Sequence, residues 1–379
     1  MDIPVVKLPF SAEDISALAD DFKALLSSGH IAMGERVRLF EEAFARFSGV
    51  PHAIAVSNGT AALEIICRAL DLSGASVCVP ANTFMATALA PIAAGAKIIL
   101  VDVEPATMQM DPDDLARKIR EDTRAVILVH LGGFISPRHE RIAQITADAG
   151  AALIEDACHA HGATVFARKA GSIGLAGAFS FYPTKVLTTA EGGAITTADP
   201  ELRDKALSLR QHGQSRPGSN VHEEFGLNYR PSEIHALLGL NLMPRAKSLL
   251  AARRHAARVY DRLLGGSVLE PIVLPPEYEP SYYKYIVRLP PNVARDELKE
   301  RLLADYNLRL AGEVYATPLH RQPFWRAYPQ TLAAPLGAFP GAEETCAAHV
   351  CLPIWPGLPE PDQEKIAEAL LATVGKIGK

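Results

Sequence analysis

Three short apolar runs that alternate with helical segments constrain the fold more than any other feature of this sequence. They are KIILVD (97–102), AVILVH (125–130) and AALIED (151–156), and segments with helical patterns separate them. Strands that are apolar on both faces and alternate with helices are typical of mainly parallel sheets covered by helices on both sides. The sequence therefore predicts an α/β fold with such a sheet at its centre.

Each of these runs ends in a polar or charged side chain, namely Asp102, His130 and Asp156. In open α/β sheets, ligands bind in the crevice beyond the carboxyl ends of the strands. We therefore expect a functional site at the edge of the sheet where these side chains lie.

The pattern changes near residue 245. A helical tract over residues 232–264 contains Pro244, which is expected to kink or split it. Beyond this tract, the sequence predicts two strands and two helices, at 282–289, 295–306, 351–355 and from 360 onward. We therefore predict a large domain over residues 1–245 and a smaller C-terminal α/β domain over residues 246–379.

Charge and composition exclude several classes of protein. The net charge of −5 and the lack of a dense Lys/Arg block argue against a nucleic-acid-binding surface. The longest stretch of low polarity, residues 84–96, is too short to span a bilayer, and the first ten residues lack the apolar core of a signal peptide. The five scattered cysteines fit reduced thiols. We therefore expect a cytoplasmic protein that binds neither nucleic acid nor membrane.

A single lysine, Lys185, lies in the otherwise uncharged stretch FSFYPTKVLTTA (179–190). Apolar strands on both sides disfavour its ammonium form, which makes the amine more nucleophilic near neutral pH. The alternative is a surface-loop lysine whose charged head reaches water. The residue is thus a candidate catalytic group.

The segment EDACHAHG (155–162) leaves three interpretations open. Its possible metal ligands, which suggest a zinc site, are Asp156, Cys158, His159 and His161. Ligands crowded at one strand end cannot easily all reach one ion, and no CxxC or HxxxH partner lies elsewhere, so we predict no metal. The segment is then either a capped strand end with buried imidazoles or a carboxylate, Asp156, aimed at a cationic ring nitrogen.

The segment SNGTAAL (57–63) places Asn58 and Gly59 directly before a helix that begins near Thr60. A helix N-terminus of this kind suits a phosphate, although an ordinary cap after a tight turn fits the same residues. Pyridoxal phosphate (PLP) needs a phosphate cradle, a carboxylate that keeps its ring nitrogen protonated, and a lysine that holds it as a Schiff base. The three segments supply all three elements, so we predict PLP as the cofactor.

The order of motifs along the chain resembles that of a known family. The motifs are SNGTAAL, PANTFMATA, VHLGG, IEDACHAHGA, SFYPTK, EGGAITT and GLNYRPSEIHAL. They are similar to those of the DegT/DnrJ/EryC1/StrS family of PLP-dependent nucleotide-sugar aminotransferases. The resemblance implies a fold-type I PLP-dependent transferase that forms a homodimer with shared active sites. It also implies transfer of an amino group from glutamate to a keto sugar, a 4-keto-6-deoxy or 3-keto hexose, linked to a nucleoside diphosphate. Such reactions belong to deoxyamino-sugar or surface-polysaccharide biosynthesis.

The resemblance also implies roles for individual residues. Lys185 matches the Schiff-base lysine and Asp156 the partner of the ring nitrogen. The matches to phosphate contacts are Gly59, Thr60, Ser180 and, reaching the partner subunit, Asn228. Phe84 matches an aromatic residue that stacks on the cofactor ring, although a core residue that opens a helix fits equally well. His159 stands where many relatives carry Gln near the 3-oxygen of the cofactor, and its role is left open.

The substrate is the least determined part of the prediction. Candidate sugar contacts are Met33, Glu191, Tyr315 and His320, and for His320 a satisfied surface histidine is an equal alternative. Relatives that replace the lysine by histidine are sugar dehydratases, so Lys185 argues against that branch. Two alternatives stay open: a transaminase for another cyclic keto substrate, such as an inosose, or a non-catalytic regulatory protein with the same fold.

Overall fold

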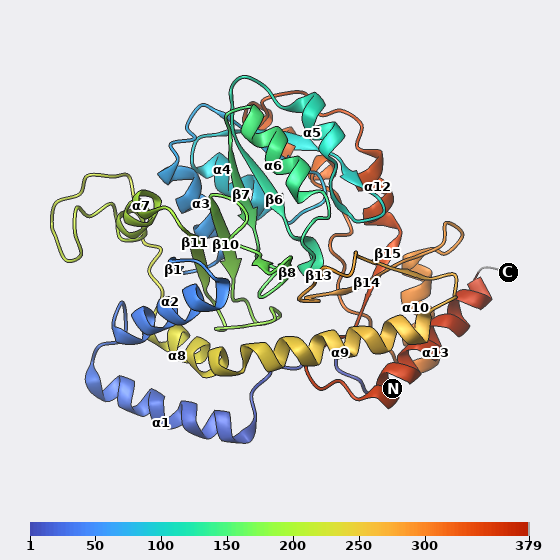
Figure 1. Cartoon of the computed structure of the whole chain (residues 1–379). Helices are drawn as coiled ribbons and strands as arrows, with labels where there is room; N and C mark the ends of the chain where they lie inside the picture. Colours follow the sequence, from blue (N-terminus) through green and yellow to red (C-terminus); the bar gives the residue numbers. More distant parts are fainter. Residues whose placement is uncertain (378–379) are drawn as a thin grey trace.

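A seven-stranded sheet lies at the centre of the computed structural model, which describes residues 1–377 (Figure 1). The strand order is β1-β11-β10-β7-β6-β2-β3. The bounds are His52–Val56 (β1), Ser76–Pro80 (β2), Lys97–Val101 (β3), Thr123–Val129 (β6), Ala152–Asp156 (β7), Ala176–Ser180 (β10) and Gly193–Thr197 (β11). β11 is antiparallel to both of its neighbours, and the other pairings are parallel. The predicted mainly parallel sheet is confirmed.

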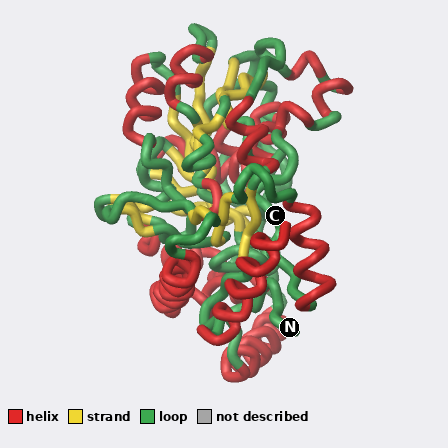
Figure 2. Tube along the Cα trace, turned by 90° about the vertical axis from the view of Figure 1, so that its right-hand side faces the viewer, coloured by secondary structure: helices red, strands yellow, loops and turns green. Residues whose placement is uncertain are grey.

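Helices cover both faces of this sheet, as Figure 2 shows from the side. One face packs against α3 (Gly59–Ala69), α4 (Ala86–Ala93) and α7 (Pro200–Arg210). The other packs against α5 (Pro112–Lys118), α6 (His139–Asp148), α2 (Glu35–Ser48) and α8 (Glu233–Leu242). Side chains alternate between the faces along each strand, so Ile154 of β7 packs toward α3 and Leu153 toward α6. By the same alternation, Asp156 belongs to the α3 face and Glu155 to the opposite one.

Pro244 divides the helical tract as the sequence predicted. α8 ends at Leu242, a 3-10 turn follows over Met243–Arg245 (η2), and α9 covers Ala246–Leu264. Proline has no N–H to donate within a helix, and its ring clashes with the preceding turn. α9 then runs beneath both parts of the molecule in Figure 1.

The first helix, α1 (Ala12–Ser28), begins directly after its capping residue, Ser11. The Ser11 side chain accepts a hydrogen bond from the Asp14 N–H, and the Asp14 carboxylate accepts one from the Ser11 N–H. This reciprocal pair is a capping box. Leu25 is the one fully buried residue of the helix, which lies at the lower edge of Figure 1.

The C-terminal part contains its own sheet and its own apolar cluster. Its three strands lie in the order β12 (Glu270–Pro271), β14 (Tyr285–Arg288) and β15 (His349–Leu352). The cluster joins them to α9, α10 (Arg295–Tyr306) and α13 (Glu360–Ile377), and Met1 and Ile3 pack against it. β14 and β15 are shorter than predicted, and β15 begins two residues before the predicted start. A separate core supports our proposal of a smaller domain from residue 246, to which the first residues of the chain are joined.

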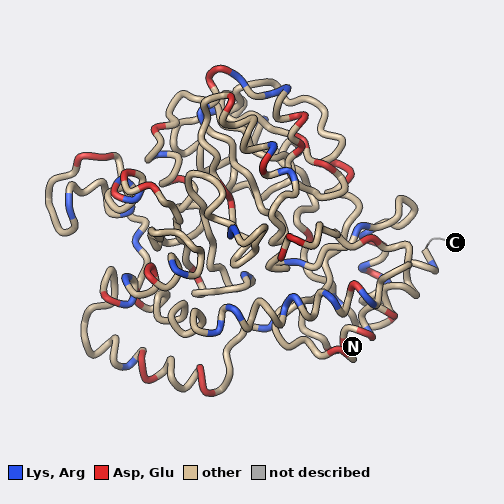
Figure 3. The backbone as a smooth tube through the Cα atoms, viewed as in Figure 1, with Lys and Arg blue, Asp and Glu red and all other residues tan. Residues whose placement is uncertain are grey.

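Several short elements complete the fold. They are β4 (Val103–Glu104), β5 (Gln109–Met110), β8 (Thr164–Val165), β9 (Arg168–Lys169), β13 (Tyr278–Glu279), η1 (Leu131–Gly133), η3 (Leu319–Arg321), η4 (Pro329–Thr331), α11 (Phe324–Ala327) and α12 (Pro340–Ala347). Across residues 1–377, no helix combines the length and apolar character needed to cross a membrane. Figure 3 shows that charged residues gather on the outer helices and loops, while the central strands carry few. The few charged side chains in the interior, such as Glu155 and Asp156, must therefore be stabilised by hydrogen bonds.

Candidate active site

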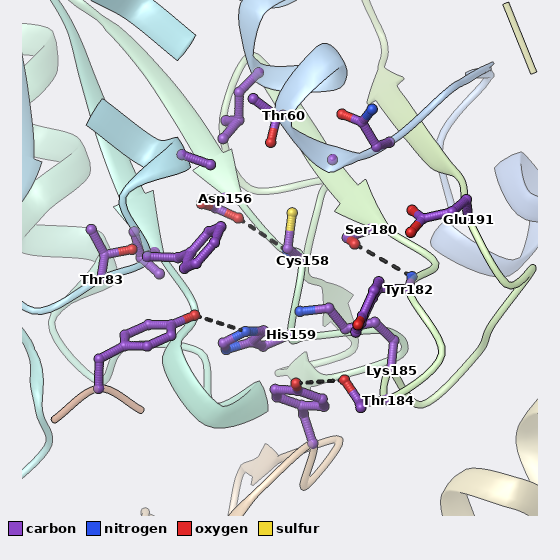
Figure 4. A pocket seen from close by; sticks show the side chains of 18 residues that line it. Thr60, Thr83, Asp156, Cys158, His159, Ser180, Tyr182, Thr184, Lys185 and Glu191 are labelled. Atoms are coloured by element: carbon purple, nitrogen blue, oxygen red, sulfur yellow. Dashed lines mark hydrogen bonds between the residues drawn. The ribbon is translucent and has the colours of Figure 1, made fainter. Parts of the chain in front are cut away.

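A cavity of about 440 Å³ lies beyond the carboxyl ends of the parallel strands, next to the N-terminus of α3 (Figure 4). The predicted site residues that line it are Gly59, Thr60, Phe84, Asp156, His159, Ser180, Lys185, Glu191 and Tyr315. Lining residues that the sequence analysis did not single out as site residues include Thr83, Tyr182, Thr184, Tyr283 and Cys158, the last considered only as a metal ligand. The structure thus brings together most of the predicted residues.

Asp156 ends β7 and faces this cavity with a nearly buried carboxylate, 7% exposed. Its Oδ2 accepts a hydrogen bond of 2.8 Å from the Thr87 hydroxyl, and its Oδ1 accepts one of 3.2 Å from the Cys158 N–H. Thr87 in turn lies 2.8 Å from the Thr83 hydroxyl oxygen. A carboxylate has about four acceptor positions, so Asp156 keeps capacity for a cationic N–H in the cavity.

The N-terminus of α3 forms another wall of the cavity. Asn58 caps the helix, because its Oδ1 accepts a hydrogen bond of 2.8 Å from the Ala61 N–H. The N–H groups of Gly59 and Thr60, in the first turn, have no acceptor within the helix. A Cβ at position 59 would lie 2.8 Å from Cys158 Sγ and 2.9 Å from Ser180 Cβ, so only glycine fits there. This wall therefore presents free N–H groups and a positive helix end to an anion.

Lys185 follows β10 in a tight turn, in which its N–H donates to the Tyr182 carbonyl at 2.9 Å. Its side chain reaches into the cavity rather than over an open surface loop, and Nζ lies 4.5 Å from the centroid of the Tyr283 ring. Burial lowers the pKa of the Lys185 amine, and the neighbouring Cys158 and Asp156 offset part of this effect. A lowered pKa increases the fraction of neutral, nucleophilic amine near neutral pH.

Tyr283 comes from the C-terminal part of the chain and was missed by sequence reasoning. Its hydroxyl lies 2.9 Å from the Thr184 hydroxyl, and its ring centroid lies 4.3 Å from that of His159. The buried guanidinium of Arg253 donates hydrogen bonds to the Tyr282 and Tyr283 carbonyls at 2.8 and 3.0 Å. Burial lowers the pKa of Arg253 to about 10. Arg253 thus fixes the turn that carries Tyr283 into the cavity.

The possible metal ligands of the EDACHAHG segment do not converge. The Cys158 thiol lies against the Ala178 carbonyl at 3.7 Å, and the His161 ring lies among Phe179, Phe181 and Phe44. Among the described residues, no group of three or more His, Cys, Asp or Glu side chains could hold a metal ion. The segment instead divides its polar groups between the cavity and the interior.

Of the three polar strand ends, only Asp156 lines the cavity. The Asp102 carboxylate accepts hydrogen bonds from the N–H groups of Gly341 and Ala342, at 3.0 and 2.8 Å, and so caps α12. His130 is fully buried, and its Nε2 lies 2.8 Å from the Glu155 carboxylate. The expectation that all three strand ends form the site is therefore wrong for Asp102 and His130.

Three predicted site residues lie outside the cavity of this chain: Met33, Asn228 and His320. His320 Nε2 lies 3.0 Å from the Glu343 carboxylate, and its ring stacks on Phe339. Asn228 is exposed, in the segment between α7 and α8. Their roles toward the sugar and toward a second subunit stay predictions.

Comparisons with known proteins agree with this geometry. The sequence model of the DegT/DnrJ/EryC1/StrS aminotransferase family matches residues 13–371. The chain is 33% identical over 379 residues to a pleiotropic regulatory protein of Geobacillus stearothermophilus, covering 98% of each chain. It is also 33% identical to the dTDP-4-dehydro-2,3,6-trideoxy-D-glucose 4-aminotransferase of Saccharopolyspora spinosa, covering 94% of this chain and 92% of the other. The PMP form of Spr1654 from Streptococcus pneumoniae has a TM-score of 0.90 at 26% identity, covering 100% of this chain and 98% of the other.

Proposed function

Since the chain belongs to the DegT/DnrJ/EryC1/StrS aminotransferase family, we propose that its cavity transfers an amino group from glutamate to a nucleotide-linked keto sugar. The protein is a PLP-dependent aminotransferase with the fold-type I architecture. The acceptor would be a 4-keto-6-deoxy or 3-keto hexose on a nucleoside diphosphate, and the pathway that of a deoxyamino sugar or a surface polysaccharide. The observation that carries the proposal is the convergence of Lys185, Asp156 and the N-terminus of α3 on one cavity.

The residues of the cavity fit PLP. Gly59 and Thr60 lie in the first turn of α3, whose N–H groups have no acceptor within the helix and are available to a phosphate. The Asp156 carboxylate, with acceptor capacity left, would hold a protonated ring nitrogen. Lys185 would hold the cofactor covalently. Phe84, 58% exposed in this chain, would cover one face of the ring.

Bound PLP supplies an electron-poor ring that stabilises the negative charge on a carbon that loses its proton. The Asp156 carboxylate favours the protonated ring nitrogen, because an opposite charge stabilises the charged form. Once the amino donor has displaced it from the cofactor, the Lys185 amine, whose pKa burial lowers, would take this proton at Nζ and would deliver it to the former aldehyde carbon of the cofactor. The Tyr283 ring covers one side of Nζ and limits the positions that the amine can take.

Two observations support a homodimer with shared sites. Glutamate brings two carboxylates and a nucleotide sugar brings a diphosphate, yet Lys185 is the only Lys or Arg among the described residues that line the cavity. Further cations and donors would come from a second copy, to which Asn228 belongs in our proposal. α1 also carries Ile15, Phe22 and Leu26 with 61%, 39% and 52% of their surfaces exposed, an apolar face that a second copy would cover. We place this dimer in the cytoplasm.

A substrate screen tests the proposed reaction. The PLP-loaded protein is incubated with L-glutamate and a panel of nucleotide-linked 3-keto and 4-keto hexoses, with an inosose as the alternative acceptor. Mass spectrometry reads both the aminated product and 2-oxoglutarate. We expect amination of a nucleotide-linked sugar and none of the inosose. Borohydride reduction should fix the pyridoxyl group on Lys185, and its recovery on a different lysine would refute that assignment.

A subunit-mixing experiment tests the shared site. Lys185→Ala and Asn228→Asp are each expected to be inactive, the second because it sets a carboxylate against the cofactor phosphate. After dissociation and reassociation, a heterodimer contains one site with both natural residues. Random pairing then restores activity up to about a quarter of wild type. If subunits exchange and activity stays absent while Asn228→Asp alone is inactive, Asn228 acts within its own chain.

A regulatory role is the second candidate, because the Geobacillus relative bears the name of a regulatory protein. A cheap observation separates the two. An aminotransferase loaded with PLP is yellow and loses this colour when L-glutamate converts the cofactor, whereas a purely regulatory protein keeps it. We expect the loss of colour, because both Lys185 and Asp156 line the cavity.

A further inference from the structure

A chain of three hydrogen-bonding groups enters the cavity from the side opposite the N-terminus of α3. The Gly132 N–H donates to Nδ1 of His159 at 3.2 Å. Nε2 of His159 lies 3.3 Å from the Tyr315 hydroxyl, a contact marked by the dashed line at His159 in Figure 4. Gly132 has φ 66°, and a Cβ there would lie 2.6 Å from Ile286, so glycine is needed to aim this N–H. His159 is nearly buried.

These contacts determine where the protons lie. Nδ1 accepts from a backbone N–H, so the neutral ring must carry its proton on Nε2. A second proton on Nδ1 would face the Gly132 N–H without an acceptor. Burial, followed by the positive charges of Lys185 and Lys284, also lowers the pKa of His159 well below its usual range. His159 is therefore a neutral ring whose Nε2–H donates to the Tyr315 oxygen.

The Tyr315 hydroxyl must then direct its own hydrogen elsewhere. Among the described residues, His159 is the one hydrogen-bond partner of this hydroxyl, and Tyr315 lines the cavity. Burial, followed by the charge of Asp156, raises the pKa of the phenol well above its usual range, so it stays protonated. Tyr315 thus presents an O–H donor to whatever the cavity binds.

The backbone that carries Tyr315 is held by two buried side chains. The Tyr315 N–H donates to Asn82 Oδ1 at 3.2 Å, and the Val314 N–H donates to Nε2 of His349 at 3.0 Å. Nδ1 of His349 lies 2.6 Å from the Thr345 carbonyl and so carries that ring's proton. Asn82 and His349 are buried, so the phenol extends from a fixed segment.

The polar groups of PLP are a phosphate, a ring nitrogen, an aldehyde and a ring oxygen next to the aldehyde. The first three match the α3 terminus, Asp156 and Lys185. The ring oxygen is next to the aldehyde, so it belongs beside the lysine, where His159 also lies. Nζ of Lys185 is 4.5 Å and the centroid of the His159 ring is 4.3 Å from the centroid of the Tyr283 ring. Since the His159 proton is committed to Tyr315, the donor at this position is the phenol.

We propose that Tyr315 donates the hydrogen bond to the ring oxygen of bound PLP and that His159 acts through Tyr315 as a positioning residue. The proposal rests on the proposed function and deepens it. It differs from the sequence-based expectation, which set His159 itself near this oxygen.

The first test needs no cofactor. In PLP-free protein with 15N-labelled histidine, the ring nitrogens of His159 should show a protonated Nε2 and a bare Nδ1 that do not titrate between about pH 6 and 8. The signal is assigned by its loss in His159→Gln. A protonated Nδ1, or a titration midpoint near about pH 6.5, overturns the proposal.

The second test follows the visible absorption of the PLP-loaded protein against pH. The absorption changes when the proton near the ring oxygen of PLP and the nitrogen of Lys185 is lost, and the midpoint of this change is the pKa of that proton. A hydrogen bond donated to the oxygen stabilises the form without the proton. Tyr315→Phe should therefore raise the midpoint by about one pH unit. His159→Leu should shift the midpoint in the same direction. His159→Gln should shift it by a smaller amount, because an amide can also accept from the Gly132 N–H and donate to the Tyr315 oxygen. The double variant Tyr315→Phe/His159→Leu should shift it no further than Tyr315→Phe alone.

Tyr278→Phe is the matched control, because its hydroxyl pairs with His139 at 3.4 Å outside the cavity, and it should leave the midpoint unchanged. An unchanged midpoint in PLP-loaded Tyr315→Phe overturns the proposal while the aminotransferase function stands. A slower loss of colour with L-glutamate at an unchanged midpoint also overturns it and assigns Tyr315 to the substrate. If wild type takes up no PLP, the proposed function itself fails.

Discussion

Two neighbouring carboxylates at the end of β7 point to opposite faces of the sheet and have opposite surroundings. Glu155 is fully buried, and four N–H groups donate to it: those of His130 Nε2, Gly171, Ile173 and Gly174, at 2.6 to 2.8 Å. Asp156 receives two donors from the protein, the Thr87 hydroxyl and the Cys158 N–H, and borders the cavity.

The difference shows how one strand serves structure and chemistry at once. A carboxylate offers about four acceptor positions, and the protein fills those of Glu155 and leaves part of those of Asp156 open. The filled carboxylate organises the loop before β10, and the open one is available to a ligand. Exposure alone does not distinguish them, since both are nearly or fully buried.

The largest expected effect tests whether the chemistry belongs to the Asp156 face. Lys185→Ala should reduce aminotransfer by at least about a thousandfold, because both covalent attachment and proton transfer are lost. The midpoint temperature of thermal unfolding should be unchanged or slightly higher, because the variant no longer buries an amine. Activity with L-glutamate and the melting curve are measured together. Retained activity would move the site away from this face.

The second effect concerns the opposite face of the sheet, where Glu155 is expected to stabilise the fold. Glu155→Gln should lower the free energy of unfolding by about 3 kcal/mol, because the new NH₂ group meets N–H donors in a buried position. Urea unfolding of the PLP-free protein measures this loss. A loss of activity without a loss of stability would show that Glu155 is not structural.

The third change is the counterpart on the cavity face. Asp156→Asn should lower activity about a hundredfold, since a neutral amide no longer favours a protonated ring nitrogen, while stability changes little. Activity and urea unfolding are compared with those of Glu155→Gln. Exhaustive chelation of wild type is the control and should leave activity unchanged. If zinc restored activity after chelation, the role given to Asp156 would have to be replaced by metal binding.

The last effect, which is small at any one pH near neutrality, concerns His161, a buried histidine in the same EDACHAHG segment. His161 is fully buried among aromatic rings, and burial, with the charge of Lys185, lowers its pKa to about 3. The unfolded chain therefore binds a proton below about pH 6.5 that the folded protein does not, and stability falls as the pH falls. The cost is about 1.4 kcal/mol per pH unit between these values.

His161→Leu removes this proton and should flatten the dependence of the unfolding free energy on pH between about 6.5 and 4.5. Urea unfolding at several pH values gives the slope for both proteins. A slope that stays unchanged would mean that His161 is protonated in the folded state.

Local patterns predicted the elements with strong local causes. The apolar runs became β3, β6 and β7, and Pro244 split the long helical tract. The order of the strands and the antiparallel direction of β11 could not be predicted this way, because they depend on pairings between distant segments. The same holds for strands of two residues, which are too short for any periodicity.

The site was predictable where its residues share a motif and not where the fold brings them from afar. Lys185, Asp156 and Gly59 stand in recognisable segments. Thr87, which binds Asp156, lies 69 residues away from it in the chain. Tyr315 was a predicted site residue, but its contact with His159, 156 residues away, could not be predicted. Tyr283 lies in an ordinary aromatic run, YYKY, whose residues carry no signal of a site.

The origin of Tyr283 and Tyr315 bears on how such enzymes can be recombined. Both lie beyond residue 245, yet both line the cavity whose other walls come from the first part of the chain. A chimera that kept residues 1–245 and took the rest from a relative would therefore replace the two cavity-lining residues Tyr283 and Tyr315 by those of the relative. Shuffling the two parts between family members would therefore alter ligand preference even though every residue at the ends of β7 and β10 stayed the same.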